Sequence, residues 1–560
     1  MAARAYAAAA AHMTARTAVY TRAFTAAALP PGVALRKALL NPRPTQLDIL
    51  SGIVAANRDT VFGTAHGFAD IRSYGDFARQ VPVSDYDDYE PHIDRVARGY
   101  PRVLTRDPVM FLEPTGGSSG PSKLIPYTRS LKRQLACGIL PWLRDLFVKR
   151  RSLRGGRSYW AISPPAQHER GETIPIGAPH DADYLPAVPG AILGRMLVPP
   201  PSVADITDLD ACRHVTLIAL LLAEDLTFVS VWNPSFLTLL AGRLDASFDK
   251  LLHDVEHGTI SADITPMVRA RLERALPARP DIASRLRSRF GLRPPDDLGE
   301  LWPRLRTISC WTDAHAARSV DAMRRRFPAV EVQGKGLIAT EGIVTLPLTD
   351  LAAPVAAVTS HFLEFIPEIG ETPLLVDELD EGAVYEVVLT TGGGLYRYRL
   401  KDLVRVEDHV HRTPLLRFVG RADATSDLCG EKLTPRLVER SLAAACESTG
   451  IRPLFALLSP RWDDPPRYDL WLDLDAGAGP PREAAARLGA TLDAELRAAH
   501  HYDLCRRLGQ LGEIRSHVIP GAAGIYERTC VERGQRSGAT KPVVLDTRLG
   551  WHRDLKGVVA

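Results

Sequence analysis

The sequence predicts an α/β protein, with a large N-terminal part built on mostly parallel sheets flanked by helices and a small α+β C-terminal part. Two apolar runs, at residues 226–232 (LTFVSVW) and 305–311 (LRTISCW), have the length of buried strands, and a helical stretch follows each of them. Strands that alternate with helices are typical of a parallel sheet covered on both faces. Near the C-terminus, residues 468–474 alternate with a period of two, which indicates a strand of a separate, smaller unit.

Composition places the chain among ordinary globular proteins. Its 560 residues are 45% hydrophobic and 24% charged, which is long enough for two or more domains. A net charge of only +3 gives no reason to expect a nucleic-acid partner, and we find no apolar run of about 18 residues that would predict a membrane span. The seven cysteines are scattered, without a C-x-x-C pair, so we expect reduced thiols and a cytoplasmic protein. We expect a monomer.

The first 47 residues hold several arginines and no acid among many alanines. This composition imitates an organellar transit peptide, but it also fits an Ala-rich helix, with translation starting either at Met1 or at Met13. We interpret it as a helix.

The remaining elements follow in chain order. Residues 44–100 read as helices, and Thr128 is a good N-cap for a long helix with an apolar stripe. A long Gly/Pro-rich region at 155–201 is of the kind that often carries function. Further helices and strands are predicted at 234–240, 245–300, 313–326, 330–332, 382–390, 434–446, 454–458, 481–506 (one helix) and 514–519.

A glycine-rich stretch, Pro114 to Lys123 (PTGGSSGPSK), is the first chemical motif. Its glycines allow a tight turn whose backbone N–H groups can bind an anion. Hydroxyls and a closing lysine add donors suited to phosphate. The stretch therefore favours a phosphate-binding loop made of Thr115, Gly116, Gly117, Ser118, Ser119, Gly120 and Lys123.

Two other interpretations of this loop stay open. It is not a Walker A loop, because Ser122 and Leu124 stand where that motif needs glycine and a hydroxyl. Gly116 to Gly120 also reads G-x-S-x-G, a hydrolase nucleophile elbow with Ser118 as nucleophile, although the extended LIPY that follows is not the helix such an elbow needs. A plain surface loop is the third interpretation.

Two carboxylates mark the ends of later strands. Glu341, after Thr340, could hold Mg²⁺ on a triphosphate, although Thr-Glu pairs are usually helix caps. Asp402 lies in LYRYRLKDLVRV, where a carboxylate could accept two ribose hydroxyls; a charged hairpin is the alternative.

Together these motifs resemble the acyl-activating, adenylate-forming superfamily. The order of the glycine-rich loop, ATEG at 339–342, the Asp402 segment and RFVGRADATSDLCGEKLTP at 417–435 is that of the superfamily. Residues 81–99 and SHFLEFIPE at 360–368 are similar to the plant auxin-responsive acyl-acid amido synthetases, the Gretchen Hagen three family.

The resemblance implies roles for individual residues. It implies that Glu341 binds Mg²⁺, Thr340 contacts the α-phosphate of ATP, Asp402 binds the ribose, Arg421 contacts ribose or phosphate, and Asp423 is a hinge. A late lysine, for which Lys541 is the candidate, would stabilise the adenylation transition state. One departure is Lys401, where the family usually has glycine before the aspartate.

The resemblance also implies the domains and the reaction. An N-terminal acyl- and ATP-binding domain would cover residues 1–422, and a mobile C-terminal domain residues 423–560. The protein would convert a carboxylic acid and ATP into an acyl-adenylate and pyrophosphate, then transfer the acyl group to an amine, such as that of an amino acid. Trp232, Trp311 and Gly336 are candidates for the acyl pocket, with core packing as the alternative. An acyl-CoA ligase and a non-catalytic adenylate-binding protein stay open.

Overall fold

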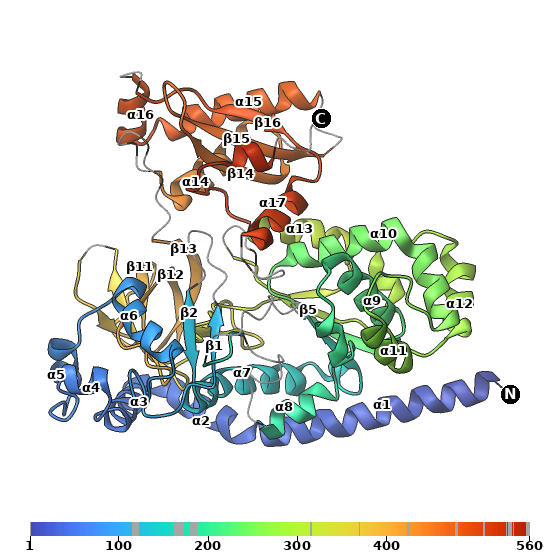
Figure 1. Ribbon diagram of the computed structural model, residues 1–560, viewed down its shortest axis with the longest axis horizontal. Coiled ribbons are helices and arrows are strands. Elements are labelled where there is room, and N and C mark those ends of the chain that lie inside the picture. Colours follow the sequence, from blue (N-terminus) through green and yellow to red (C-terminus); the bar gives the residue numbers. More distant parts are fainter. Residues whose placement is uncertain are drawn as a thin grey trace.

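The structure of the protein is a computed structural model, and it places a small C-terminal part beside a large N-terminal part (Figure 1). It describes residues 2–114, 123–161, 173–177, 187–313, 316–368, 370–422, 426, 428, 431, 433–475, 480–507, 510–533, 535, 540 and 542–555.

Six helices open the chain. They are α1 (Ala2–Ala27), α2 (Leu29–Leu40), α3 (Pro42–Ala56), α4 (Val61–Ala65), α5 (Tyr74–Gln80) and α6 (Tyr86–Ala97). A capping box at Asp85, whose backbone N–H is bonded by the Asp88 carboxylate, begins α6. The Gln46 side chain of α3 donates to the carbonyls of Val358 and His361 at 2.8 and 2.7 Å, so these early helices are fixed to a much later part of the chain.

One sheet of the large part has seven strands. They are β7 (Thr345–Leu346), β8 (Val355–Ala356), β9 (Phe362–Pro367), β10 (Leu374–Leu375), β11 (Val384–Thr390), β12 (Tyr398–Val410) and β13 (Thr413–Arg421), in the order β10-β9-β11-β12-β13-β8-β7. All of these pairs are antiparallel. Arg397 is buried beneath α5, where it bonds the Glu364 carboxylate with two nitrogens and the carbonyls of Ala78 and Val81.

A second, parallel sheet has four strands in chain order. They are β3 (Arg157–Trp160), β4 (Leu226–Ser230), β5 (Thr307–Cys310) and β6 (Glu331–Gly334). The predicted mostly parallel sheet is therefore correct for this sheet, whereas the seven-stranded sheet is antiparallel because short turns, not crossover helices, join most of its strands.

Helices cover the parallel sheet on both faces. Phe147 of α7 contacts Phe228 of β4 on one face, and the apolar stripes of α9, α10 and α13 pack on the other. The helices are α7 (Arg129–Lys149), α8 (Ala187–Gly194), α9 (Leu209–Leu221), α10 (Pro234–His257), α11 (Pro266–Ala275), α12 (Pro280–Phe290) and α13 (Ala316–Arg326), with short 3₁₀ turns η1 (Arg151–Leu153), η3 (Pro201–Asp205) and η4 (Leu298–Leu301).

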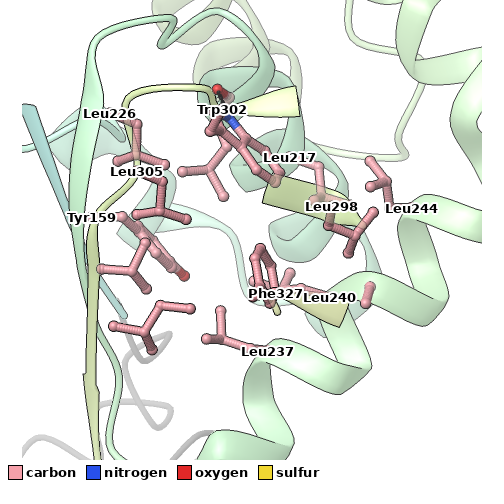
Figure 2. A pocket seen from close by; sticks show the side chains of 14 residues that line it. Tyr159, Leu217, Leu226, Leu237, Leu240, Leu244, Leu298, Trp302, Leu305 and Phe327 are labelled. Atoms are coloured by element: carbon pink, nitrogen blue, oxygen red, sulfur yellow. Dashed lines mark hydrogen bonds between the residues drawn. The ribbon is translucent and has the colours of Figure 1, made fainter. Parts of the chain in front are cut away.

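Figure 2 shows a small cavity in the apolar core between the parallel sheet and the helices α9 and α10. Its volume is about 30 Å³, and side chains such as Leu217, Leu240 and Phe327 line it. A space of this size, enclosed by apolar groups, is a packing void rather than a ligand site.

The C-terminal part is built on a three-stranded sheet, β14 (Pro453–Arg461), β15 (Arg467–Leu474) and β16 (Arg515–Val518). Its helices are α14 (Pro435–Thr449), α15 (Pro481–Leu496), α16 (His500–Arg507), α17 (Ala522–Glu532) and α18 (Trp551–Asp554). The single helix predicted at 481–506 is wrong, since the chain turns between α15 and α16. Arg213 of α9 bonds Glu527 of α17 at 2.9 Å and so joins the two parts. None of the described helices is both long and apolar enough to cross a membrane.

Candidate active site

The glycine-rich loop connects the two strands of a separate hairpin. Strands β1 (Phe111–Pro114) and β2 (Leu124–Tyr127) are antiparallel, and Pro114 pairs with Leu124. Six loop residues predicted to bind phosphate, Thr115, Gly116, Gly117, Ser118, Ser119 and Gly120, lie outside the described residues. A strand follows the loop, and α7 begins only after the Thr128 N-cap, so the strand-to-helix context of a nucleophile elbow is missing.

Lys123 ends the loop at the mouth of this hairpin. Its Nζ lies over the ring of Tyr86, 5.3 Å from the centroid, and the Tyr86 hydroxyl accepts a hydrogen bond from the backbone N–H of Leu124 at 2.8 Å. Tyr86 is in the first turn of α6, so the segment before the loop positions the lysine.

Thr340 and Glu341 occupy the tip of a tight turn. The backbone groups of Ala339 and Gly342 bond each other, and the Tyr127 hydroxyl of β2 donates to the Thr340 carbonyl at 2.8 Å. A Cβ atom on Gly342 would lie 2.9 Å from the buried imidazole of His361, so only glycine fits there. The turn therefore holds Glu341 in a fixed place beside the glycine-rich hairpin.

Asp402 and Arg421 form an ion pair on two neighbouring strands. Nη1 of Arg421 donates to Oδ1 of Asp402 at 3.0 Å, and the Asp402 side chain is 5% exposed. Asp402 and Arg421, for which the sequence predicts contacts with the ribose and phosphate of ATP, therefore lie together at the end of β13.

Burial raises the pKa of Glu341, and the Asp402 carboxylate raises it further, whereas the charges of Arg421 and Lys123 lower it. Asp402, Arg421 and Lys123 therefore lie close enough to Glu341 to interact with it, although only Asp402 and Arg421 come from neighbouring segments of the chain. The cluster holds one acid and two bases around the buried Glu341 carboxyl group, which suits a ligand that carries both phosphates and a cation.

Lys401 adopts a left-handed backbone conformation with φ of +60°. Glycine takes this conformation without strain, which explains in physical terms the glycine expected at this position. In this chain, Lys401 Nζ instead bonds Oδ2 of Asp85, the N-cap of α6, at 3.0 Å. The turn before Asp402 is therefore formed despite the larger side chain.

The three acyl-pocket candidates lie at the carboxyl ends of β4, β5 and β6. The Trp232 and Trp311 rings are 5.7 Å apart between centroids, and the backbone N–H of Trp311 donates to the backbone carbonyl of Trp232 at 2.8 Å. Both indoles are half-buried. Gly336 has φ of +77°, and a Cβ there would lie 2.7 Å from Oγ1 of Thr345, so its role is to let the backbone bend after β6.

Sequence reasoning missed Lys335, which lies between β6 and Gly336. This side chain is 3% exposed, its Nζ donates to Oγ of Ser230 at 2.8 Å, and it lies 4.4 Å from the centroid of the Trp232 ring. Burial lowers its pKa to about 7. A lysine directly after a strand of the parallel sheet, at its carboxyl end, was the available signal.

Two further predicted residues, the hinge Asp423 and the catalytic candidate Lys541, lie outside the described residues. Within the described part of the chain, no cluster of three or more His, Cys, Asp or Glu side chains could hold a metal ion alone. The buried Glu341 carboxylate still fits Mg²⁺, because this ion usually takes one or two carboxylates and completes its shell with phosphate oxygens and water.

Comparisons with known proteins agree with this arrangement. Residues 34–332 match the model of the GH3 family N-terminal domain, and residues 355–421 match that of the GH3 family central domain. Together the two matches cover the glycine-rich hairpin, strands β3 to β5, and strands β8 to β13, whereas residues 333–354, which include β7, Lys335 and Glu341, lie between them.

Curated relatives and a solved structure are similar over most of the chain. The indole-3-acetic acid-amido synthetase GH3.8 of Oryza sativa subsp. indica is 24% identical over 435 residues, which cover 72% of this chain and 71% of the relative. The jasmonoyl--L-amino acid synthetase JAR6 of Nicotiana attenuata is 23% identical over 432 residues, covering 72% and 73%. The structure of the AtGH3.15 acyl acid amido synthetase in complex with 2,4-DB superposes with a TM-score of 0.82 at 19% identity, covering 94% of this chain and 95% of that one, and so shares its fold.

Proposed function

Because the chain belongs to the GH3 family, we propose that it is an ATP-dependent acyl-acid amido synthetase, a ligase that joins a carboxylic acid to an amine through an acyl-adenylate. The relatives named for amido synthesis support the reaction class. The observation that carries the proposal is the cluster of Glu341, Asp402, Arg421 and Lys123, which the fold assembles from four segments.

In the first step, the carboxylate oxygen of the acid attacks the α-phosphorus of ATP, and the bond to pyrophosphate breaks. Lys123 and the N–H groups of the glycine-rich loop, residues 115–120, would bind the phosphates. Asp402 would accept the ribose hydroxyls, and Arg421 would hold Asp402 in place while it contacts ribose or phosphate. Thr340 would contact the α-phosphate. Magnesium, held by Glu341, would offset the negative charge of the phosphates.

In the second step, the amine nitrogen attacks the acyl carbon, and the bond to AMP breaks. An amino acid is the amine we propose, in line with the names of the relatives. The C-terminal domain, residues 423–560, would turn about Asp423 between the steps and bring Lys541 to the nucleotide in one of its positions. The match to the family's central domain ends at residue 421, which supports a boundary near 422. We propose that the protein acts as a cytoplasmic monomer.

The test is pyrophosphate release with Mg-ATP over a panel of aryl, indolyl and alkyl acids, with and without pooled amino acids, followed by mass spectrometry. We expect pyrophosphate with a subset of acids and an amide mass only when amino acids are present. A thioester that forms with added CoA, with no amide, would reassign the protein as an acyl-CoA ligase. ATP binding without pyrophosphate release from any acid would indicate a non-catalytic adenylate-binding protein.

A further inference from the structure

The side chain of Lys335 crosses the carboxyl edge of the parallel sheet. Lys335 follows β6, whereas its hydrogen-bond partner Ser230 ends β4, and β5 lies between these two strands. Neighbouring strands are about 4.8 Å apart, so the lysine spans the end of β5. Its ammonium group therefore lies on the sheet edge where open α/β folds bind their ligands.

Aromatic rings surround this ammonium group. Nζ lies 4.4 Å from the centroid of Trp232 and 5.8 Å from that of Trp142, a buried residue of α7. The second indole of the pair, Trp311, is half-buried beside Trp232. A flat or narrow ligand that binds along these two partly exposed indoles would contact Lys335 with the end that is buried more deeply.

In the described part of the chain, Lys335 has fewer polar partners than a buried cation needs. An ammonium group has three donors, and one of them bonds Ser230. Among the described residues, no carboxylate forms an ion pair with Lys335, and the group that raises its pKa electrostatically is the thiol of Cys310. Burying a charge without an opposite charge is energetically unfavourable, so a purely structural lysine is a poor explanation of this site.

The spacing from the nucleotide cluster fits an extended acid. Lys335 and Thr340 are joined by a segment in which Leu337 and Ile338 are extended and pair with Val344 and Ile343. Two extended residues span about 7 Å, which is close to the length of an aryl acid. An acid whose reacting carboxyl group lies by Thr340 would therefore have its far end beside Lys335.

We propose that Lys335 is a specificity-determining residue of the acyl pocket, which selects acids that carry a second anionic group, such as a second carboxylate, at the end opposite the reacting one. This inference rests on the proposed adenylation of a carboxylic acid. The indoles of Trp232 and Trp311 would contact the apolar body of the acid, and Lys335 with Ser230 would bind its distal anion.

The test compares matched pairs of acids that differ only in the distal group: phenylacetate with 4-carboxyphenylacetate, benzoate with terephthalate, and octanoate with octanedioate. For each pair, kcat/KM for pyrophosphate release and the Kd by calorimetry are measured for the wild-type protein, Lys335→Met, Lys335→Gln and the exposed-lysine control Lys250→Met. We expect the wild-type protein to prefer the diacid of at least one pair. Either Lys335 variant should reduce that preference by about 10- to 100-fold, as for a lost charge-assisted hydrogen bond, and Lys250→Met should keep it.

The outcomes separate this inference from the proposed function. Pyrophosphate release from monoacids without a diacid preference in any pair, or a preference that survives in Lys335→Met and Lys335→Gln, overturns the role of Lys335 and leaves the amido synthetase standing. Diacid binding that depends on Lys335, without pyrophosphate from any acid, supports the anion site and overturns the adenylation step.

Discussion

Asp402 and Arg421 are cross-strand partners in register on β12 and β13, and a 3.0 Å hydrogen bond joins their side chains. The pair lies where β13 ends and the connection to the C-terminal part begins. A carboxylate fixed in this way is oriented before any ligand binds, which lowers the entropic cost of binding one.

Replacing Asp402 by asparagine should therefore weaken ATP binding and reduce adenylation by about 100-fold or more, because the variant loses the charge of the acceptor that we propose for the two ribose hydroxyls. The shape of the side chain is kept, so the fold should persist. Calorimetry with ATP and pyrophosphate release check this. Asp408→Asn, an exposed carboxylate on the same strand, is the matched control and should behave like the wild-type protein. Near-normal turnover in Asp402→Asn would remove Asp402 from the site.

Glu341→Gln should abolish pyrophosphate release while leaving the protein as stable as the wild type, or more stable, at neutral pH. The pKa of Glu341 is raised in the folded state, so the ionised carboxyl destabilises the fold above the unfolded pKa, and this cost disappears as the pH falls. The amide has no such charge. Thermal unfolding at pH 7, with pyrophosphate release at several Mg²⁺ concentrations, checks both claims. A strongly destabilised variant would show that the carboxylate has a structural role.

Substitution of Lys401 by glycine should leave the free energy of unfolding unchanged or raise it by about 1 kcal/mol. The left-handed conformation costs a non-glycine residue about 1 kcal/mol, whereas the partly exposed ion pair with Asp85 contributes about 0–1 kcal/mol. The matched variant Lys401→Ala keeps the strain and loses the ion pair, so it should be the less stable of the two. Denaturant unfolding measures both variants, and a Lys401→Gly protein less stable than Lys401→Ala would contradict this account.

Lys335→Met should stabilise the protein at pH 7 by a few kcal/mol, since one pKa unit corresponds to about 1.4 kcal/mol. The pKa of Lys335 is lowered to about 7 in the folded state, so between pH 7 and 10 the unfolded chain binds more protons. The wild-type protein therefore gains stability as the pH rises through this range. Cys310, the titratable group that faces Lys335, has its pKa raised by burial to about 12 and stays neutral there. Calorimetric unfolding at pH 7 and pH 9.5 should show the difference between variant and wild type shrinking; a constant difference would refute the buried charge.

Removal of the Arg397 charge by Arg397→Met should destabilise the large part by about 3–5 kcal/mol, because the buried Glu364 carboxylate loses its counter-charge. Arg397 is 4% exposed and Glu364 0%, and among the described residues Tyr74 is the other side-chain donor to Glu364. The double variant Arg397→Met, Glu364→Leu removes both charges and should recover part of the loss. Thermal unfolding of the three proteins decides this; equal losses in the single and double variants would rule out an uncompensated charge as the cause.

Much of the fold could be predicted from the sequence because its signals are local. The Thr128 and Thr434 caps accept the expected backbone hydrogen bonds, and the apolar runs around Phe228 and Ile308 are strands of one parallel sheet. The directions of the strands in the seven-stranded sheet could not be predicted from adjacent residues, since they depend on how the turns join the strands. The break between α15 and α16 also has no strong glycine or proline signal, because the sequence there reads RAAHHY.

The candidate site could be predicted only in part, for a related reason. Glu341, Asp402 and Arg421 stand in ordered motifs, and the fold brings them together. Lys335 stands in no motif, and its burial depends on Trp142 and Ser230, which are far away in the chain. In the sequence, Lys401 departs from the glycine that the family usually has before the aspartate. Its ion pair with Asp85 is a tertiary contact that no pattern of adjacent residues indicates.

The hydrogen bonds of Gln46 to residues Val358 and His361 have a consequence for biosynthesis. The partners of this early side chain are 312 and 315 positions later in the chain. At a synthesis rate of about 5–20 residues per second, the N-terminal helices emerge on the order of 15–60 s before the carbonyls that fix α3 exist. The helices α1 and α2 can pack on α7 early in that interval, but the face of α3 that packs on β9 has no permanent partner until its end, so the nascent chain presents a long-lived binding surface for a chaperone there.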